Sequence, residues 1–132
     1  MRFVIDASVI IAVIGEESEK KRLIELTTGA DLLAPASVHW EIGNAFSAMI
    51  KRGKVTLEQA LTAIGIYRQI PLRFVEVELA DALQIAAEHG IYAYDAYLLQ
   101  CAIKYKSKLI TLDQKLSRIA REVNVEVEEV NQ

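Results

Sequence analysis

Short apolar runs of strand type alternate along this chain with longer segments of helical periodicity, and this alternation limits the fold more than any other feature. The strand-type runs lie at residues 2–5, 32–34, 72–77 and 108–111. Strands that alternate with helices typically form a parallel sheet covered on both faces. The sequence therefore predicts an α/β fold, a three-layer α/β/α sandwich around a mainly parallel sheet. The sheet has four strands, or five if residues 125–127 add one.

Local start and stop signals place helices between these runs. We expect helices at residues 8–14, 18–28, 37–52, 56–69, 78–89, 95–106 and 114–122. Ser18 and Ser37 are residue types that favour the N-cap position. Thr56 is followed three residues later by Gln59, a spacing that predicts a capping box. Glycines stop four of the helices: Gly15, Gly29, Gly53 and Gly90.

The 132 residues have the length of one domain, so we expect residues 1–132 to form a single unit. Hydrophobic residues make up 52% of the chain, and this excess predicts an apolar surface that a second copy could cover. No apolar run approaches the roughly 18 residues of a membrane span, and the N-terminus lacks the features of a secretory signal. The single cysteine, Cys101, is expected to be buried, which fits a cytoplasmic protein.

The net charge of −3 argues against a protein that holds nucleic acid by bulk positive charge. Basic residues nevertheless gather in three groups. These are Lys51, Arg52 and Lys54; Lys104, Lys106 and Lys108; and Lys115, Arg118 and Arg121. Most such groups are solvated helix ends, where they complement the helix dipole. One group following a phosphate backbone is the functional alternative.

Four acidic residues, far apart in the sequence, fall where the predicted fold could bring them together. Asp6 ends the first strand, and Asp113 closely follows the last one. Asp95 is expected at a helix start, and Glu41 about one turn into a helix that follows a strand. Binding sites in parallel α/β sheets form beyond the C-terminal ends of the strands, which is the edge these residues share. Carboxylates gathered there would repel one another unless protons or cations offset their charge, and hard oxygen ligands suit Mg²⁺ or Mn²⁺.

Each acid also has a simpler interpretation. Asp6, Asp95 and Asp113 could each be a helix N-cap or a first-turn acid. Glu41 could be a solvated helix residue, although Ser37 and Asn44 form a polar face with it. The residues alone leave both interpretations open.

Four motifs resemble the PIN-domain family, and in particular its small VapC-like toxins. They are Val4-Ile5-Asp6-Ala7-Ser8-Val9, residues 35–45 around Glu41, Tyr94-Asp95-Ala96-Tyr97-Leu98 with Ala102, and Leu109-Ile110-Thr111-Leu112-Asp113. Their order and spacing cover nearly the whole chain. The resemblance implies a Mg²⁺- or Mn²⁺-dependent endoribonuclease, the toxin of a type II toxin–antitoxin pair. It also implies a homodimer held inactive by a cognate antitoxin.

The resemblance assigns roles to particular residues. It implies that Asp6, Glu41, Asp95 and Asp113 form the catalytic metal site. Ser8 and Thr111 match hydroxyl positions beside that site, and Asn44 is a further supporting polar residue.

Three rival functions remain at the level of sequence. The first is a PIN nuclease that processes RNA without being a toxin. The second is a magnesium-dependent aspartyl-phosphate protein of receiver or phosphatase type, although Asp6-Ala7-Ser8 lacks the second acid expected of such a phosphatase. The third is a binding module without catalysis. A zinc site is disfavoured because His39, His89 and Cys101 lack the spacing of ligands. Ser8 also lacks the flanking glycines of a nucleophile elbow.

Overall fold

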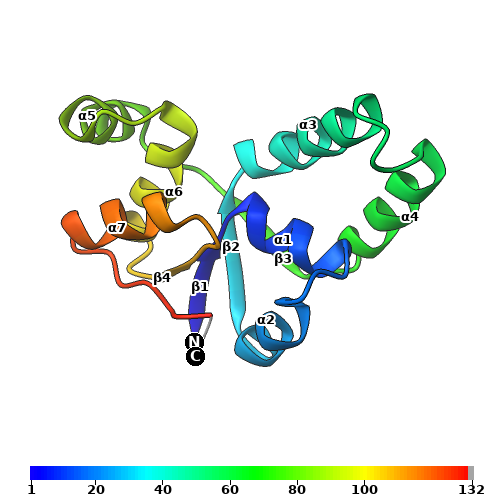
Figure 1. Cartoon of the computed structure of the whole chain (residues 1–132). Coiled ribbons are helices and arrows are strands. Elements are labelled where there is room, and N and C mark those ends of the chain that lie inside the picture. Colours follow the sequence, from blue (N-terminus) through cyan, green and yellow to red (C-terminus); the bar gives the residue numbers. More distant parts are fainter. Residues whose placement is uncertain (131–132) are drawn as a thin grey trace.

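A computed structural model describes residues 1–130, and its centre is a four-stranded parallel sheet in the order β3-β2-β1-β4. The strands are β1 (Arg2–Ile5), β2 (Asp31–Pro35), β3 (Leu72–Val75) and β4 (Lys108–Ile110). The predicted three-layer α/β/α architecture is confirmed. Because all four strands are parallel, their C-terminal ends lie at one edge of the sheet, the upper edge in Figure 1.

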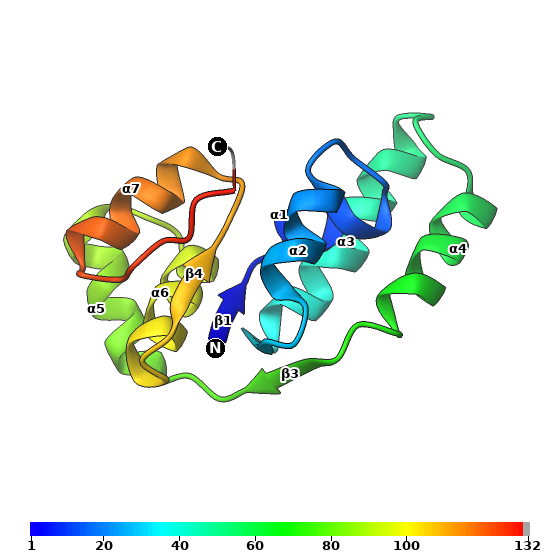
Figure 2. The same cartoon turned by 90° about the horizontal axis from the view of Figure 1, so that it is seen from below.

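Seven helices within residues 1–130 cover the two faces of the sheet. They are α1 (Ala7–Ile14), α2 (Lys20–Thr27), α3 (Ser37–Lys51), α4 (Leu57–Tyr67), α5 (Leu79–His89), α6 (Ala93–Lys104) and α7 (Gln114–Glu122). Figures 1 and 2 show α1 to α4 on one side of β1, and α5 to α7 on the other. None of these helices is long and apolar enough to cross a membrane.

The central strands are buried on both faces, as expected for a parallel sheet between helical layers. Phe3, Val4 and Ile5 of β1 are almost fully buried, and Leu33 of β2 is completely so. Leu99 of α6 is also fully buried in the same hydrophobic cluster. Burial of these side chains stabilises the sheet and fixes the two helical layers against it. The helix starts at the upper edge are thereby held in place.

Several predicted boundaries are wrong by a few residues. The third strand ends at Val75 rather than at residue 77, and the helix predicted at 56–69 ends at Tyr67. The helix predicted to start at Ser18 has Glu19 at its N-cap, and no side-chain capping bond is found there. Without such a bond, nothing local fixes where this helix begins. The predicted capping box of Thr56 and Gln59 is present.

The predicted fifth strand, residues 125–127, is reduced to one parallel bridge between Leu109 and Val127. The N–H of Leu109 donates to the carbonyl of Glu126 at 2.8 Å, and the N–H of Glu128 donates to the carbonyl of Leu109 at 2.9 Å. β4 is only three residues long, so the ladder beside it is short. The described sheet therefore has four strands.

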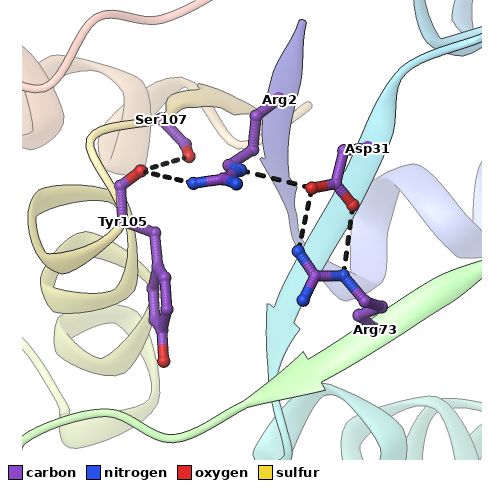
Figure 3. Close-up of polar contacts among 5 residues, drawn as sticks. All are labelled: Arg2, Asp31, Arg73, Tyr105 and Ser107. Atoms are coloured by element: carbon purple, nitrogen blue, oxygen red, sulfur yellow. Dashed lines mark hydrogen bonds and ion pairs between the residues drawn. The ribbon is translucent and has the colours of Figure 1, made fainter.

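The opposite, N-terminal edge of the sheet carries an ion-pair cluster (Figure 3). Asp31 accepts hydrogen bonds from Arg2 at 3.2 Å and from Arg73 at 2.8 and 3.2 Å. The two guanidinium groups, Arg73 first, lower the pKa of the Asp31 carboxyl. Arg2 also donates to the carbonyl of Tyr105 at 3.4 Å, an oxygen that Ser107 shares at 2.9 Å. The cluster joins the starts of β1, β2 and β3, at the edge opposite the C-terminal ends of the strands.

Candidate functional site

Asp6 and Asp113 occupy equivalent positions, each as the N-cap of the helix that follows a strand, Asp6 after β1 and Asp113 after β4. The Oδ1 of Asp6 accepts a hydrogen bond from the N–H of Val9 at 3.1 Å. The Oδ1 of Asp113 accepts from Lys115 and Leu116 at 2.9 and 3.2 Å. The capping role considered from the sequence is therefore real at both positions. It leaves a second oxygen of each carboxylate for other partners.

The buried carboxylate of Asp6 is the centre of a hydroxyl network that joins the ends of β1 and β4. Ser8 donates to its Oδ1 at 2.6 Å, and Thr111 donates to its Oδ2. Ser8 in turn accepts from the N–H of Leu112 at 3.1 Å, and Thr111 from the N–H of Asp113 at 3.0 Å. Each hydroxyl thus donates to the carboxylate while accepting from the backbone. This network fixes both the position and the rotamer of Asp6.

Burial raises the pKa of Asp6 despite these donors, and the negative charge of Asp113 raises it further. The hydrogen bonds from Ser8, Thr111 and Val9 act in the opposite direction. A carboxylate that is buried near a second carboxylate is strongly stabilised by a proton or by a nearby cation.

Glu41 faces the same edge from α3, and its carboxyl pKa is strongly raised. Its pKa is raised from 4.5 to about 7, first by burial and then by the negative charges of Asp6 and Asp95. Its Oε2 is buried and makes no hydrogen bond within residues 1–130. A buried oxygen without a donor is costly, so this position favours an additional ligand.

Asp95 completes the group from the other helical layer. Burial raises its pKa, Asp113 raises it further, and the Lys115 ammonium lowers it. The acids therefore raise one another's pKa values. Asp6 and Asp95 raise the pKa of Glu41, and Asp113 raises the pKa of both Asp6 and Asp95. Four segments that are distant in sequence supply one electrostatically coupled site.

Lys115 was foreseen only as one member of a basic group. Its position two residues after Asp113, in the first turn of α7, was the available signal, because that helix begins at the same edge. The structure places its charge close enough to Asp95 to oppose the repulsion there.

Two of the predicted details, the helix positions of Asp95 and Ser37, need correction. Asp95 is the third residue of α6 rather than its start, because the helix begins at Ala93. Ser37 is the first residue of α3 and not its cap, and its Oγ is buried without a hydrogen-bond partner among residues 1–130. Asn44 is exposed, and within residues 1–130 no hydrogen bond links its side chain to the carboxylates.

The donor set fits a hard divalent cation, although not as a closed cage. Within residues 1–130, no three Asp, Glu, His or Cys side chains are already arranged to hold a metal ion. Mg²⁺ commonly keeps several waters and binds through only one or two carboxylates. The buried, unpartnered oxygen of Glu41 and the raised pKa values of three acids indicate where positive charge would be stabilising.

Replacing Glu41 by Gln should change how the stability of the metal-free protein depends on pH. The Glu41 carboxyl has a pKa of about 7 when folded and an ordinary value of 4.5, so the folded chain holds its proton more tightly. Its contribution to stability is therefore fully present below pH 4.5 and is lost as the pH rises to about 7. Between pH 4.5 and about 7, we expect the free energy of unfolding of Glu41→Gln to fall less than that of the parent. Urea unfolding at several pH values, with EDTA present, measures both. The exposed Glu17→Gln should leave the profile of the parent unchanged, and identical profiles for the parent and Glu41→Gln would contradict the assignment.

Comparisons with known proteins show which family the chain belongs to. The family model described as "PIN domain" matches residues 3–122, which include all four acids. The chain belongs to the PIN-domain family. Among curated proteins, this PIN domain is 26% identical over 122 residues to "Ribonuclease VapC3" of Pyrobaculum aerophilum. The match covers 89% of this chain and 93% of that protein.

Solved structures show the same fold. PAE2754 from Pyrobaculum aerophilum has a TM-score of 0.71 and 23% identity, covering 90% of this PIN domain and 87% of that chain. VapBC2 from Rickettsia felis, crystallised with a DNA fragment from its promoter, has a TM-score of 0.68 and 18% identity, covering 97% and 98%. FitAcB from Neisseria gonorrhoeae has a TM-score of 0.57 and 17% identity, covering 97% of both chains.

Proposed function

We propose that this PIN domain is a ribonuclease that hydrolyses RNA phosphodiester bonds with the help of Mg²⁺ or Mn²⁺. The observation that carries the proposal is the group of acids from distant segments at one sheet edge, where Glu41 is buried beside the charges of Asp6 and Asp95 and its Oε2 makes no hydrogen bond within residues 1–130. The curated relative named "Ribonuclease VapC3" supports RNA as the substrate. The match of the PIN-domain family model to residues 3–122 agrees with this proposal.

The metal would be held by Asp6, Glu41, Asp95 and Asp113, directly or through water. When bound, Mg²⁺ or Mn²⁺ lowers the pKa of a water molecule and neutralises charge that develops on the phosphate and on the leaving oxygen. Ser8 and Thr111 orient the carboxylate of Asp6 through the hydroxyl network. Asn44, exposed on α3, has the weakest support and is retained only as an outer polar residue.

The protein groups suggest a single displacement by water, without a covalent intermediate. Where Glu41 does not itself bind the metal, its carboxylate would be available to accept the proton of the attacking water. The charge of Lys115 acts on Asp95, so its ammonium group would be available to contact the negatively charged phosphate. The carboxylates of Asp6 and Asp113 are oriented by helix caps, and that of Asp6 also by two hydroxyls, so these two need little rearrangement when substrate binds.

The proposal includes the biological setting that the sequence implied. We infer that residues 1–132 act as one cytoplasmic domain, the toxin of a toxin–antitoxin pair, with a cognate antitoxin protein and a second copy as partners. The described residues share one hydrophobic core, which supports the single domain. On α4, Leu57 and Leu61 are 61% and 60% exposed. α4 instead buries Ala60, Ala63 and Tyr67, which leaves an apolar stripe for a partner.

Digestion of RNA by the purified chain tests the proposed activity. Cleavage should occur with Mn²⁺, should stop when EDTA is added, and should return when Mn²⁺ is restored in excess. The Asp6→Asn protein, prepared in parallel, should remain inactive in all three conditions and so exclude a contaminating nuclease. Cleavage that persists in EDTA, or that Asp6→Asn retains, would contradict a metal-dependent site at this edge.

A further inference from the structure

The three basic groups noted in the sequence occupy different places in the fold, and one of them begins at the acidic edge. The group at residues 51–54 follows the far end of α3, about 15 Å along the helix axis from Glu41. In the second group, Lys104 and Lys108 already form ion pairs. The third group lies on α7, the helix that follows β4, and consists of Lys115, Arg118 and Arg121.

These three residues form a basic stripe along the solvent-facing side of α7. The other side of the helix is buried and consists of Leu116, Ser117, Ile119 and Ala120. Lys115, Arg118 and Arg121 fall at positions i, i+3 and i+6, and all three are exposed. Side chains three residues apart on a helix are neighbours, with Cβ atoms about 5–6 Å apart. The basic stripe is therefore continuous from the first turn of α7 to its last.

The basic stripe starts at the acidic centre. The backbone N–H of Lys115 donates to the Oδ1 of Asp113 at 2.9 Å, which holds the first turn of α7 at the site. The ammonium group of Lys115 acts on Asp95 and lowers the pKa of that carboxyl. Arg118 lies about 4.5 Å further along the helix axis. Figure 1 shows that α7 then runs away from the centre of the sheet, so the stripe leads outward from the acids.

Helix stability does not account for the first two charges of the basic stripe. Basic side chains stabilise the last turn of a helix, whereas Lys115 lies in the first turn, at the positive end of the helix dipole. Within residues 1–130, neither Lys115 nor Arg118 forms an ion pair, but Arg121 is paired with Glu129. The part of the stripe nearest the acids thus carries free positive charge, and its far end is neutralised.

We propose that Arg118 is a positioning residue that binds a backbone phosphate beside the one that is cut, so that the RNA strand follows α7 from Lys115 to Arg118. The inference rests on the proposed ribonuclease function and adds the path of the RNA away from the acids. The net charge of −3 makes such local contacts necessary, because bulk positive charge cannot hold the strand. Loss of Arg118 should raise KM and leave kcat nearly unchanged, because Arg118 holds the strand outside the reacting centre.

The salt dependence of RNA binding tests this contact. A basic side chain that neutralises a phosphate releases counterions, so losing one contact reduces the slope of log affinity against log salt by about 0.7 to 0.9. We would measure the anisotropy of a fluorescein-labelled RNA dodecamer in Mn²⁺ with the Asp6→Asn protein, which is expected to bind RNA without cutting it. Arg118→Gln in this background should weaken binding roughly fivefold and reduce the slope by that amount.

Arg121→Gln is the matched control, because it removes the same charge about one turn further along the same helix. Glu129 already neutralises Arg121, so this change should leave the affinity and the slope almost unaltered. Arg118→Lys keeps the positive charge and should retain most of the slope. In the protein with Asp6 intact, initial rates at increasing RNA concentration should show a KM about fivefold higher for Arg118→Gln and an almost unchanged kcat.

Equal loss of affinity in Arg118→Gln and Arg121→Gln would overturn the inference, because net charge alone would then explain both. It would also be overturned by an unchanged slope in Arg118→Gln, by a slope that falls as far in Arg118→Lys, or by absence of RNA binding before either arginine is replaced. Sedimentation in which Arg118→Gln dissociates a dimer but binds RNA normally would identify the stripe as an interface between copies.

The two proposals fail in different ways. Metal-dependent cleavage with the same KM in Arg118→Gln and Arg121→Gln would reject only the path along α7. The expected loss of affinity in Arg118→Gln, in a protein that shows no metal-dependent cleavage, would reject only the proposed ribonuclease function.

Discussion

The Asp95→Asn protein should cleave RNA roughly 100-fold more slowly than the parent, or not at all, while it remains folded. The change removes one negative charge from a site in which Asp113 and Glu41 already interact with Asp95. Without that charge the site holds a divalent cation less well, although the side chain keeps almost the same shape. Initial rates of digestion in Mn²⁺ and thermal unfolding by circular dichroism together measure the two parts of this prediction.

The fold offers a matched control for this substitution. Asp81 lies in the first turn of α5, as Asp95 lies in the first turn of α6, and it is exposed. Asp81→Asn should therefore change the charge and the helix start in the same way and leave cleavage unaffected. Unchanged cleavage by Asp95→Asn would remove Asp95 from the chemistry. An unfolded Asp95→Asn protein would show instead that the residue mainly stabilises its helix.

Replacing Thr111 by Val should destabilise the protein by about 2 kcal/mol at neutral pH, although the two side chains have nearly the same shape. The hydroxyl of Thr111 donates to buried Asp6 and accepts from the N–H of Asp113 at 3.0 Å. Valine can do neither, so the change leaves a buried carboxylate oxygen and a backbone N–H without their partner. Urea unfolding of the metal-free protein measures the loss.

Thr62→Val is the matched control, because Thr62 is exposed and donates only along its own helix, to the carbonyl of Glu58 at 3.1 Å. We expect its unfolding midpoint to remain close to that of the parent. If Thr111→Val is as stable as Thr62→Val, the hydroxyl network does not hold Asp6 in place. The proposed support of the site from β4 would then fail.

Local signals were sufficient for much of the fold. The capping box of Thr56 and Gln59 was predicted correctly, as was α7 from Gln114 to Glu122, because both depend on residues within one or two turns. Apolar runs identified β1 and β2, since strands buried on both faces must be continuously hydrophobic. The errors at Ser18 and at residues 125–127 arose where no local group fixes a boundary. There the extent of an element depends on its tertiary neighbours.

The face that α4 turns toward the core was equally invisible in the sequence. Leu57 and Leu61 are exposed, whereas the smaller residues Ala60 and Ala63 pack inside. The hydrophobic pattern of this helix fits two different faces, and only the position of the neighbouring helices selects one. The exposure of these leucines is therefore determined by tertiary packing and not by the sequence of the helix alone.

The sequence by itself determined that acids would follow two strands and begin or enter two helices, because strand ends and helix starts share one edge in any parallel α/β sheet. Only the tertiary structure decided that Thr111 would donate to Asp6 across 105 residues of chain, and that Glu41 would be buried beside two other carboxylates. Hydrogen bonds and pKa values depend on distance and burial in space. Residue order restricts where such groups lie, but packing alone sets how closely they approach.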